Sequence, residues 1–206
     1  MTPIRLYTAA TPNGQKASIM LEEVGLPCEV HAMDIGSANQ TRTPEYLAMN
    51  ANGKIPVIVD PDAGRTVVES GAILLYLAER SGKLLPKPGD DTLTWLFFQA
   101  PHVGPMLGQL GYFKVFAPEP VPAAIERFER ESDRVLGVLD TQLGRHEYLA
   151  GDYGMGDIMT WPWIASAQKR LGKSYEAMPN LARWVAAIGE RPAVARGMAV
   201  PAPKPG

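Results

Sequence analysis

The chain is poor in cysteine, in long apolar runs and in net charge. Its 206 residues include one cysteine, Cys28, so no disulfide can form within the chain. The longest apolar run, residues 72–78, is far shorter than the roughly 20 residues that span a bilayer. No apolar leader follows Met1, and a chain without disulfides suits a reducing compartment. We therefore expect a cytoplasmic protein that has no membrane partner.

The balance of charge and the spacing of histidines exclude further classes. The formal net charge is −2 and the isoelectric point is about 5.9, whereas a nucleic-acid surface needs clustered lysine and arginine. The three histidines, His31, His102 and His146, share no metal-ligand spacing with one another or with Cys28. We predict that the protein binds neither nucleic acid nor a metal ion.

The first 80 residues alternate between strand and helix signals. The pattern is a βαβ unit, then a short helix, a hairpin and a final helix, which is the order of a thioredoxin-like domain. We predict an α+β protein whose first domain, residues 1–80, holds a mixed four-stranded sheet with helices. The expected strands cover 4–8, 28–34, 57–59 and 66–68, and the expected helices cover 12–24, 44–49 and 70–80.

Strand signals vanish in the rest of the chain. Residues 81–90 are rich in Gly, Pro and Lys, a composition typical of a linker. Beyond them apolar residues recur with helical spacing, so we predict an all-helical domain over 91–200 and a disordered tail over 201–206. Gly104 and Pro105 interrupt the first of these helices, which we expect to be kinked or broken there.

Two short stretches carry the most specific pattern. Ile55-Pro56 precedes a predicted strand, and Glu69-Ser70 precedes a predicted helix. Proline lacks an N–H and can adopt a cis bond, which can turn the backbone of Ile55 toward an extended ligand. Ser70 begins a helix whose unpaired N–H groups attract a carboxylate, and the Glu69 side chain can accept from an ammonium. Together these groups suit an amino acid joined to a peptide backbone.

These four residues resemble the glutathione-binding site of the glutathione S-transferase superfamily. Residues 6–8 (Leu-Tyr-Thr), 11–14 (Thr-Pro-Asn-Gly) and 104–109 (Gly-Pro-Met-Leu-Gly-Gln) extend the resemblance over nearly the whole chain. The last two motifs are most similar to the Nu class, whose members are glutathione-dependent disulfide reductases. The resemblance implies a homodimer that takes one or two glutathione molecules, or glutathione disulfide, in each site and uses no metal.

The turn at residues 11–14 is where the resemblance places catalysis. Glutathione's thiol is mostly protonated at neutral pH, so the site must donate hydrogen bonds to its thiolate. The Thr11 hydroxyl, the Asn13 amide and the N–H groups of the helix end can all donate. By resemblance, Asn13 is the catalytic donor, with Thr11 beside it. The structural alternative is ordinary helix capping and an Asn-Gly turn.

The resemblance adds three binding residues outside these motifs. It places Gln40 on the glycyl end of glutathione and Arg127, from the neighbouring subunit, on the γ-glutamyl carboxylate. Lys54 either reaches the glycyl carboxylate or is only a solvent-exposed side chain of its loop. The alternatives are a solvated loop side chain for Gln40 and a surface ion pair with Glu131 for Arg127.

Two side chains compete for the catalytic role and are interpreted as structural. Tyr7 lies inside an apolar strand, where its ring is expected to pack against neighbours. Cys28 begins a predicted strand away from the turn, and free cysteines are usually buried and inert. If neither residue attacks, bound glutathione is itself the nucleophile.

Two residues of the second half are also expected to be structural. His102 is interpreted as a half-buried structural imidazole, with a minor acid–base role as the alternative. Asp157 occupies the capping position of a helix, although Gly154 replaces the usual Ser or Thr three residues earlier. We expect Asp157 still to bond backbone groups at that turn.

The expected reaction is reduction of a small disulfide by glutathione, a thiol–disulfide exchange that needs no protein cysteine. Two alternatives remain open. One is a non-catalytic binding or regulatory protein, because a fold alone does not fix function. The other is conjugation of glutathione to electrophiles, which demands an apolar pocket such as one built from Trp95, Phe98, Met106, Tyr112 and Phe113.

Overall fold

A computed structural model describes residues 1–202 and divides the chain into two compact units. The first contains Met1–Leu85 and the described residues from Glu190 on, and the second contains Pro86–Gly189. The expected domain ranges, 1–80 and 91–200, stay predictions. Of the tail expected to be disordered, residues from 203 on lie outside the described part of the chain.

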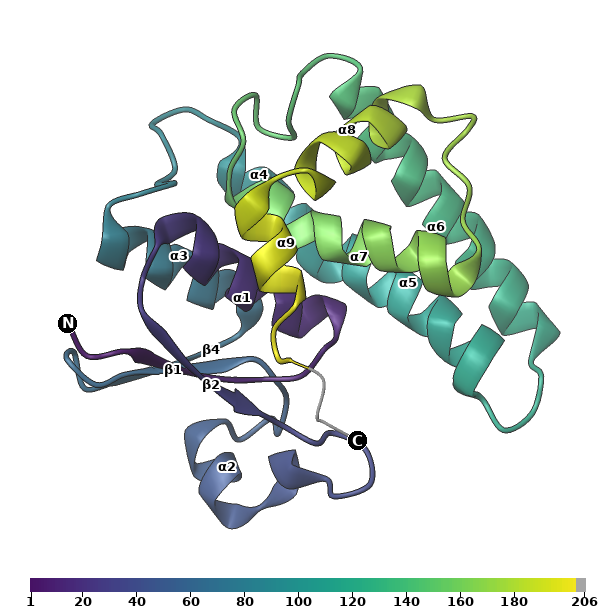
Figure 1. Cartoon of the computed structure of the whole chain (residues 1–206). Helices are drawn as coiled ribbons and strands as arrows, with labels where there is room; N and C mark the ends of the chain where they lie inside the picture. The colour runs from purple at the N-terminus through teal and green to yellow at the C-terminus, as the bar shows by residue number, and fades with distance from the viewer. Residues whose placement is uncertain (203–206) are drawn as a thin grey trace. The chain divides into compact units, whose positions relative to one another are not determined.

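The first unit is built on a four-stranded mixed sheet with the strand order β2-β1-β3-β4 (Figure 1). β1 and β2 are parallel, whereas β3 is antiparallel to both β1 and β4. This confirms the predicted α+β architecture with a mixed sheet. The strands are β1 (Ile4–Thr8), β2 (Cys28–Ala32), β3 (Val57–Asp60) and β4 (Arg65–Val68).

Helices cover both faces of this sheet (Figure 1). Helices α1 (Pro12–Val24) and α3 (Ser70–Ser81) lie on one face, and α2 (Pro44–Met49) lies on the other. Along β1 the buried residues alternate with half-buried ones, so Leu6 and its second neighbours form the core beneath α1 and α3. The alternation sends Tyr7 to the opposite face.

The first unit also includes a helix that the sequence analysis did not predict. Helix α9 (Pro192–Met198) packs along α1, far away in sequence. The Ser18 hydroxyl donates to the Gly197 carbonyl at 2.7 Å. A Cβ at Gly197 would lie 2.5 Å from the Ile19 Cα, so only glycine permits this approach. Arg191, just before α9, forms an ion pair with a glutamate of α1.

The second unit is helical. No strand occurs between residues 86 and 189, all of which the structure describes, and this confirms the expected all-helical second half. The longest helix, α6, is amphipathic and buries Val135, Leu136 and Leu139. The helices are α4 (Thr92–Phe98), α5 (Gly104–Gly111), α6 (Pro122–Leu143), α7 (Met155–Leu171) and α8 (Pro179–Gly189).

The predicted break near Gly104 is instead a π-helical segment, Gln99–Val103, between α4 and α5. The Gly104 N–H donates to the Gln99 carbonyl, five residues back, so the wider turn carries the helix past Pro105 without a break. The glycines serve packing, because a Cβ at Gly108 would lie 3.3 Å from the Trp163 ring. The helix is therefore irregular where a kink or a break was expected, and the irregularity is a π-helical segment and not a break.

Asp157 holds the start of α7, as predicted. Its buried carboxylate accepts from the N–H groups of Leu149 and Gly154 at 3.1 and 3.0 Å and from the Trp184 indole at 2.8 Å. Burial raises the pKa of Asp157 to about 6, and these hydrogen bonds oppose the rise. The carboxylate thus joins α7, α8 and the loop before α7 into one unit.

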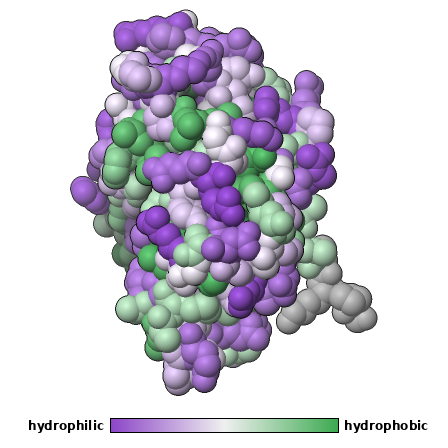
Figure 2. Space-filling view, turned by 90° about the vertical axis from the view of Figure 1, so that its left-hand side faces the viewer, coloured by the Kyte–Doolittle hydropathy of each residue, from purple (hydrophilic) through white to green (hydrophobic). Residues whose placement is uncertain are grey.

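None of the described helices is both long enough and apolar enough to cross a membrane. Figure 2 shows one face of the molecule, on which hydrophobic residues are scattered between hydrophilic ones.

Candidate functional site

The strand registers bring four turns to one edge of the sheet in the first unit. β1 and β2 are parallel, with Thr8 opposite Ala32, so the chain leaves both strands at this edge. β3 is antiparallel to β1, with Tyr7 opposite Val57, so the chain enters β3 at the same edge. It leaves β4 here too, because Val57 faces Val68.

Most of the predicted site residues therefore meet at one edge. Residues 11–13 follow β1, and the loop that ends at Gln40 follows β2. Residues 54–56 enter β3, and residues 69–70 follow β4. The sequence places these segments up to about sixty positions apart, and only sheet pairing brings them together.

At the first turn, Thr11 is the N-cap of α1. Its hydroxyl oxygen accepts from the Gly14 N–H at 3.3 Å, which is the capping role named above as the structural alternative. A Cβ at Gly14 would lie 2.2 Å from the Ala9 carbonyl oxygen, so the glycine lets the helix begin close to the end of β1. Thr11 thus fixes the turn that carries Asn13.

Beside this turn lies a buried lysine that the sequence analysis missed. The Lys16 ammonium donates to the Asn13 side-chain oxygen at 2.9 Å, and Lys16 is only 2% exposed. Burial lowers the pKa of Lys16 to about 7, partly opposed by the negative charge of Glu69. The sequence did contain a signal for this contact, because residues three positions apart on a helix, such as Asn13 and Lys16, are neighbours on its surface.

Glu69 and Ser70 stand at the start of α3. Glu69 has a φ of 68°, a left-handed conformation that is uncommon for a residue with a Cβ. Its side chain is exposed and makes no capping hydrogen bond to the helix, while Ser70 is the first helical residue. The carboxylate of Glu69 and the N-terminal N–H groups of α3 thus face the same edge of the sheet.

Ile55 lies between α2 and β3, and the Ile55-Pro56 bond is cis. Tyr46 and Asn50 donate to the Lys54 carbonyl at 2.9 and 2.8 Å and so fix the preceding residue. Ile55 is half-buried, and in the described part of the chain no hydrogen bond engages its backbone N–H or carbonyl. These two groups can pair with an extended peptide as in a β-ladder. The Lys54 side chain is exposed.

Gln40 closes the loop that follows β2. Its side-chain oxygen accepts from the Asp34 N–H at 2.8 Å, and its own N–H donates to the Asp34 carbonyl at 2.9 Å. Gln40 is exposed. The side-chain oxygen therefore has a structural role in the loop, and the amide nitrogen is the arm suited to a ligand carboxylate.

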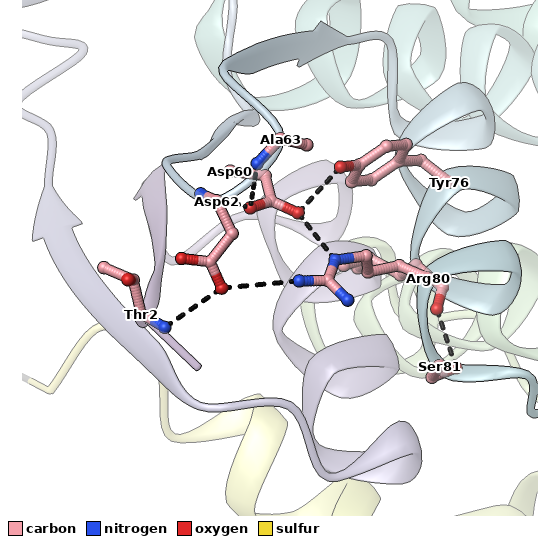
Figure 3. Close-up of polar contacts among 8 residues, drawn as sticks. Thr2, Asp60, Asp62, Ala63, Tyr76, Arg80 and Ser81 are labelled. Atoms are coloured by element: carbon pink, nitrogen blue, oxygen red, sulfur yellow. Dashed lines mark hydrogen bonds and ion pairs between the residues drawn. The ribbon is translucent and has the colours of Figure 1, made fainter.

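A polar cluster fixes α3 against the β3–β4 hairpin (Figure 3). The Tyr76 hydroxyl and the Arg80 guanidinium donate to the buried Asp60 carboxylate at 2.7 and 3.0 Å. Burial alone would raise the pKa of Asp60, but hydrogen bonds from Tyr76, Arg80 and the Ala63 N–H outweigh it and lower the pKa. Because these contacts fix α3 on the hairpin, they also fix its N-terminus at the sheet edge.

The two competing side chains have surroundings that fit structural roles. The Tyr7 ring stacks on His31, with ring centres 4.5 Å apart, on the sheet face opposite α1. Burial raises the pKa of the Cys28 thiol to about 11, and the nearby Glu22 and Glu29 add to the rise. A thiol with this pKa is almost fully protonated at neutral pH, so Cys28 is unsuited to be a nucleophile.

Arg127 lies in the second unit, on α6, and its side chain is exposed. In the described part of the chain no close ion pair joins Arg127 to Glu131, which pairs with Arg134 at 2.7 Å. The Arg134 hydrogen bond is the main cause that lowers the pKa of Glu131, and the Arg127 charge adds to it. Among the described residues no hydrogen bond or ion pair engages the Arg127 guanidinium.

His102 is exposed rather than half-buried, and its ring lies against the ring of Phe98.

Four of the five apolar residues suggested for an electrophile pocket, all except Met106, form two ring pairs within the second unit. Trp95 is buried and its ring meets Phe98 with centres 5.2 Å apart, while Tyr112 and Phe113 meet at 5.1 Å. A groove of about 650 Å³ lies elsewhere in this unit, between α7 and α8, and none of the five lines it.

Chemically, the sheet edge offers a peptide-pairing backbone, a helix N-terminus, a carboxylate and an amide donor within one unit. These groups match the backbone, the carboxylate, the ammonium and the sulfur of a small γ-linked or α-linked peptide. No group of three or more potential metal ligands occurs among the described residues.

Family models match both halves of the chain. The model described as "Glutathione S-transferase, N-terminal domain" matches residues 2–79, and "Glutathione S-transferase, C-terminal domain" matches residues 122–187. The resemblance inferred from the sequence motifs is confirmed.

Known proteins are similar over almost the full length. "Disulfide-bond oxidoreductase YfcG" of Escherichia coli is 41% identical over 204 residues, which cover 95% of this chain and 94% of the relative. A glutathione transferase homolog from Lodderomyces elongisporus was solved with two glutathiones per subunit. Its TM-score is 0.92 at 37% identity, and the match covers 98% of this chain and 100% of that chain. A Pseudomonas putida glutathione transferase was solved with one glutathione disulfide per subunit. Its TM-score is 0.89 at 40% identity, and the match covers 97% of this chain and 92% of that chain.

Proposed function

The chain belongs to the glutathione S-transferase family, and we propose that it is an enzyme that reduces small disulfides with glutathione. The observation that carries this proposal is the convergence of residues 11–13, 54–56 and 69–70 at one edge of the sheet. The disulfide-bond oxidoreductase named above supports the reaction class. The two relatives solved with two glutathiones or with glutathione disulfide support the co-substrate.

Glutathione is held through its peptide groups and its charged ends. The N–H and carbonyl of Ile55, kept available by the turn at Pro56, pair with the cysteinyl backbone. The N-terminus of α3 at Ser70 binds the γ-glutamyl carboxylate, and Glu69 accepts from the γ-glutamyl ammonium. Lys54 and the amide nitrogen of Gln40 reach the glycyl carboxylate. The thiol is then directed toward Asn13 and the turn that Thr11 caps.

The reaction is two successive thiol–disulfide exchanges. The thiolate of one glutathione attacks a sulfur of the substrate disulfide, forms a new S–S bond and releases one substrate sulfur as a thiolate. A second glutathione thiolate attacks the mixed disulfide, which yields glutathione disulfide and releases the other substrate sulfur. The two protons lost by the glutathiones protonate the two released thiolates. Asn13 lowers the barrier by donating a hydrogen bond to the sulfur that carries charge.

Four finer assignments complete the proposal: the class, the homodimer and the role of Arg127 follow from the resemblance, and the cytoplasmic location follows from the single cysteine. We assign the enzyme to the Nu class, as a cytoplasmic homodimer in which Arg127 of one subunit binds the γ-glutamyl carboxylate in the other. The exposed Arg127 guanidinium, without an ion pair among the described residues, supports this role. Exposed apolar side chains of the second unit support an interface between subunits. They are Leu93, Phe97, Tyr112, Val115, Phe116 and Val121.

The test is glutathione-dependent reduction of a simple dialkyl disulfide, coupled to glutathione reductase. We expect turnover with the disulfide that exceeds turnover in parallel assays with an aryl halide electrophile. Faster conjugation of the aryl halide would replace reduction by conjugation as the function. Glutathione binding without turnover on either substrate would indicate a binding or regulatory protein.

A further inference from the structure

Lys16 is the feature of the first unit that capping and core packing leave unexplained. A lysine that is 2% exposed on a helix is costly, because a buried ammonium loses its hydration. The neighbours on the same helix, Ala17, Ile19 and Met20, are buried apolar side chains of the kind that usually fills such a position. A polar group kept there at a cost to stability suggests a function.

The contact that Lys16 makes has a definite chemical direction. In its protonated form Lys16 can only donate hydrogen bonds, and the Asn13 atom that accepts from it at 2.9 Å is the side-chain oxygen. This fixes which way the Asn13 amide is turned, an orientation that otherwise depends on the surrounding network. The two arms of an amide point apart. With the oxygen held by Lys16, the half-buried side chain presents its N–H₂ arm away from the lysine.

We propose that Lys16 is a positioning residue, which holds the Asn13 oxygen so that the Asn13 amide donates to the glutathione sulfur. This inference rests on the proposed function, because it gives Asn13 its role toward glutathione. Without Lys16 the amide can turn over and present its oxygen, a lone-pair acceptor, to the thiolate. That orientation repels the thiolate and favours the neutral thiol.

Lys16 is also linked electrostatically to the far side of the site. The carboxylate of Glu69, the residue just before α3, is the negative charge that acts on Lys16. The arginines that α9 brings to α1, Arg191 and Arg196, are engaged with Glu23 and Glu22. The Lys16 ammonium thus connects the thiol end of the site at Asn13 with the carboxylate of Glu69.

The experiment is a mutant cycle with Lys16→Met, Asn13→Ala and the double variant. Lys16→Met keeps an unbranched side chain as far as the Cε position and removes the ammonium donor. The matched control is Lys83→Met, since Lys83 also donates from the first unit to α1, at the Val24 carbonyl, but at the other end of the helix. For each protein we would measure kcat and KM for disulfide reduction, the ultraviolet absorption of bound glutathione thiolate against pH, and the affinity for S-methylglutathione.

We expect Lys16→Met to lower kcat roughly tenfold or more, to raise the pKa of bound glutathione and to leave the affinity for S-methylglutathione unchanged. The double variant should be no worse than Asn13→Ala, because both changes remove the same hydrogen bond to sulfur. Lys83→Met should match the wild type in all three measurements.

Two results would overturn the proposal. Additive losses in the double variant would mean that Lys16 acts on the thiolate directly or elsewhere, and not through Asn13. An unchanged thiolate pKa in Lys16→Met would mean that the lysine only supports the fold. The thiolate titration requires only bound glutathione, so it tests Lys16 even if the wild type fails to reduce disulfides. If the wild type bound no glutathione, the proposed function and this inference would both fail.

Discussion

Among single residues, Asn13, Lys16 and Cys28 show how environment decides chemistry. Cys28 is the chain's one thiol, yet burial and two neighbouring glutamates keep it protonated. Asn13 has no acid–base chemistry of its own, but it lies at the sheet edge beside an ammonium that orients it. The reactive sulfur in this site is therefore expected to come from the ligand, and the protein's part is to stabilise its charge.

This division of roles predicts opposite outcomes for two variants. Cys28→Ala should retain disulfide reductase activity within about twofold, because the thiol takes no part in the exchange. Asn13→Ala should lose roughly 10- to 100-fold in kcat, the order expected for removal of one donor to a developing charge. The coupled glutathione reductase assay measures both. Loss of activity in Cys28→Ala with a preserved fold would mean that a protein disulfide is on the pathway.

Lys16 should cost stability in a pH-dependent way. Its pKa is about 7 in the folded state, against 10.5 for an exposed lysine, so the unfolded chain binds more protons between these limits. Wild-type stability should therefore rise with pH across this window. Lys16→Met should gain roughly 1–4 kcal/mol below pH 7, and the gain should shrink toward about pH 10. Urea denaturation of both proteins near pH 7 and near pH 10 measures this difference in the free energy of unfolding.

A gain independent of pH would mean that Lys16 binds its proton equally in the folded and unfolded states, so that folding does not lower its pKa. A loss of stability in Lys16→Met would show that its hydrogen bond to Asn13 and the attraction of the Glu69 charge outweigh the cost of burial.

At the scale of elements, buried contacts fix each unit at a few helix ends and crossings. α9 crosses α1 where Gly197 meets Ile19, and α7 begins where Asp157 accepts from three donors in the loop before α7 and in α8. Neither contact touches the candidate site. Both are therefore expected to affect stability without changing the chemistry.

Gly197→Ala tests the crossing of α9 and α1. The new Cβ would lie 2.5 Å from the Ile19 Cα and 2.7 Å from its nitrogen, so backbone must move. We expect a loss of about 1–3 kcal/mol in the free energy of unfolding, despite the better helix propensity of alanine. The control is Gly137→Ala on α6, where a Cβ meets nothing within 4 Å and should stabilise by up to about 1 kcal/mol. Equal effects in the two variants would contradict the tight crossing.

Asp157→Asn tests the start of α7. The carboxylate accepts on both oxygens, so either orientation of the asparagine amide places an N–H₂ group against a donor. We expect a loss of about 1–3 kcal/mol in the free energy of unfolding, measured by urea denaturation. Asp152→Asn provides the control, since Asp152 forms an exposed ion pair with Lys87 and its substitution should change stability by less than about 1 kcal/mol.

At the scale of the whole molecule, the question is whether one subunit completes the site of another. Arg127 belongs to the second unit and the sheet-edge site to the first. An exposed guanidinium can bind a carboxylate supplied from outside its own unit, because arginine donates two parallel hydrogen bonds to a carboxylate. The proposed homodimer uses Arg127 in this way.

Hybrid dimers test this arrangement. Asn13→Ala and Arg127→Ala should each lower kcat/KM by roughly 10-fold or more on their own. If Arg127 acts across the interface, unfolding and refolding the two variants together restores one intact site in every hybrid dimer, and activity should rise above that of either variant. If Arg127 acts within its own subunit, no hybrid holds an intact site. Activity that fails to rise, with hybrid dimers shown by mass spectrometry, would exclude the shared site.

The sequence by itself determined the kind of most strands and helices and the positions of the main motifs, although α9 was not predicted. Strand alternation, helical spacing and the turns at residues 55–56 and 69–70 are local signals, and they were sufficient to predict the mixed sheet and the helical second half. The motifs also identified the family, because they resemble a known site residue by residue. The π-helical turn before Pro105 was seen only as an irregularity, since local sequence does not show which carbonyl will accept.

Only the tertiary structure decided how separate segments combine. Sheet pairing set four turns at one edge, and burial of Lys16 beside Asn13 and near Glu69 depends on packing of α1 and α3 over the sheet. The return of α9 to α1 rests on a contact between Gly197 and Ile19, almost the whole chain apart. Burial and pKa are set by neighbours distant in sequence, so residue type and spacing alone could not reveal them.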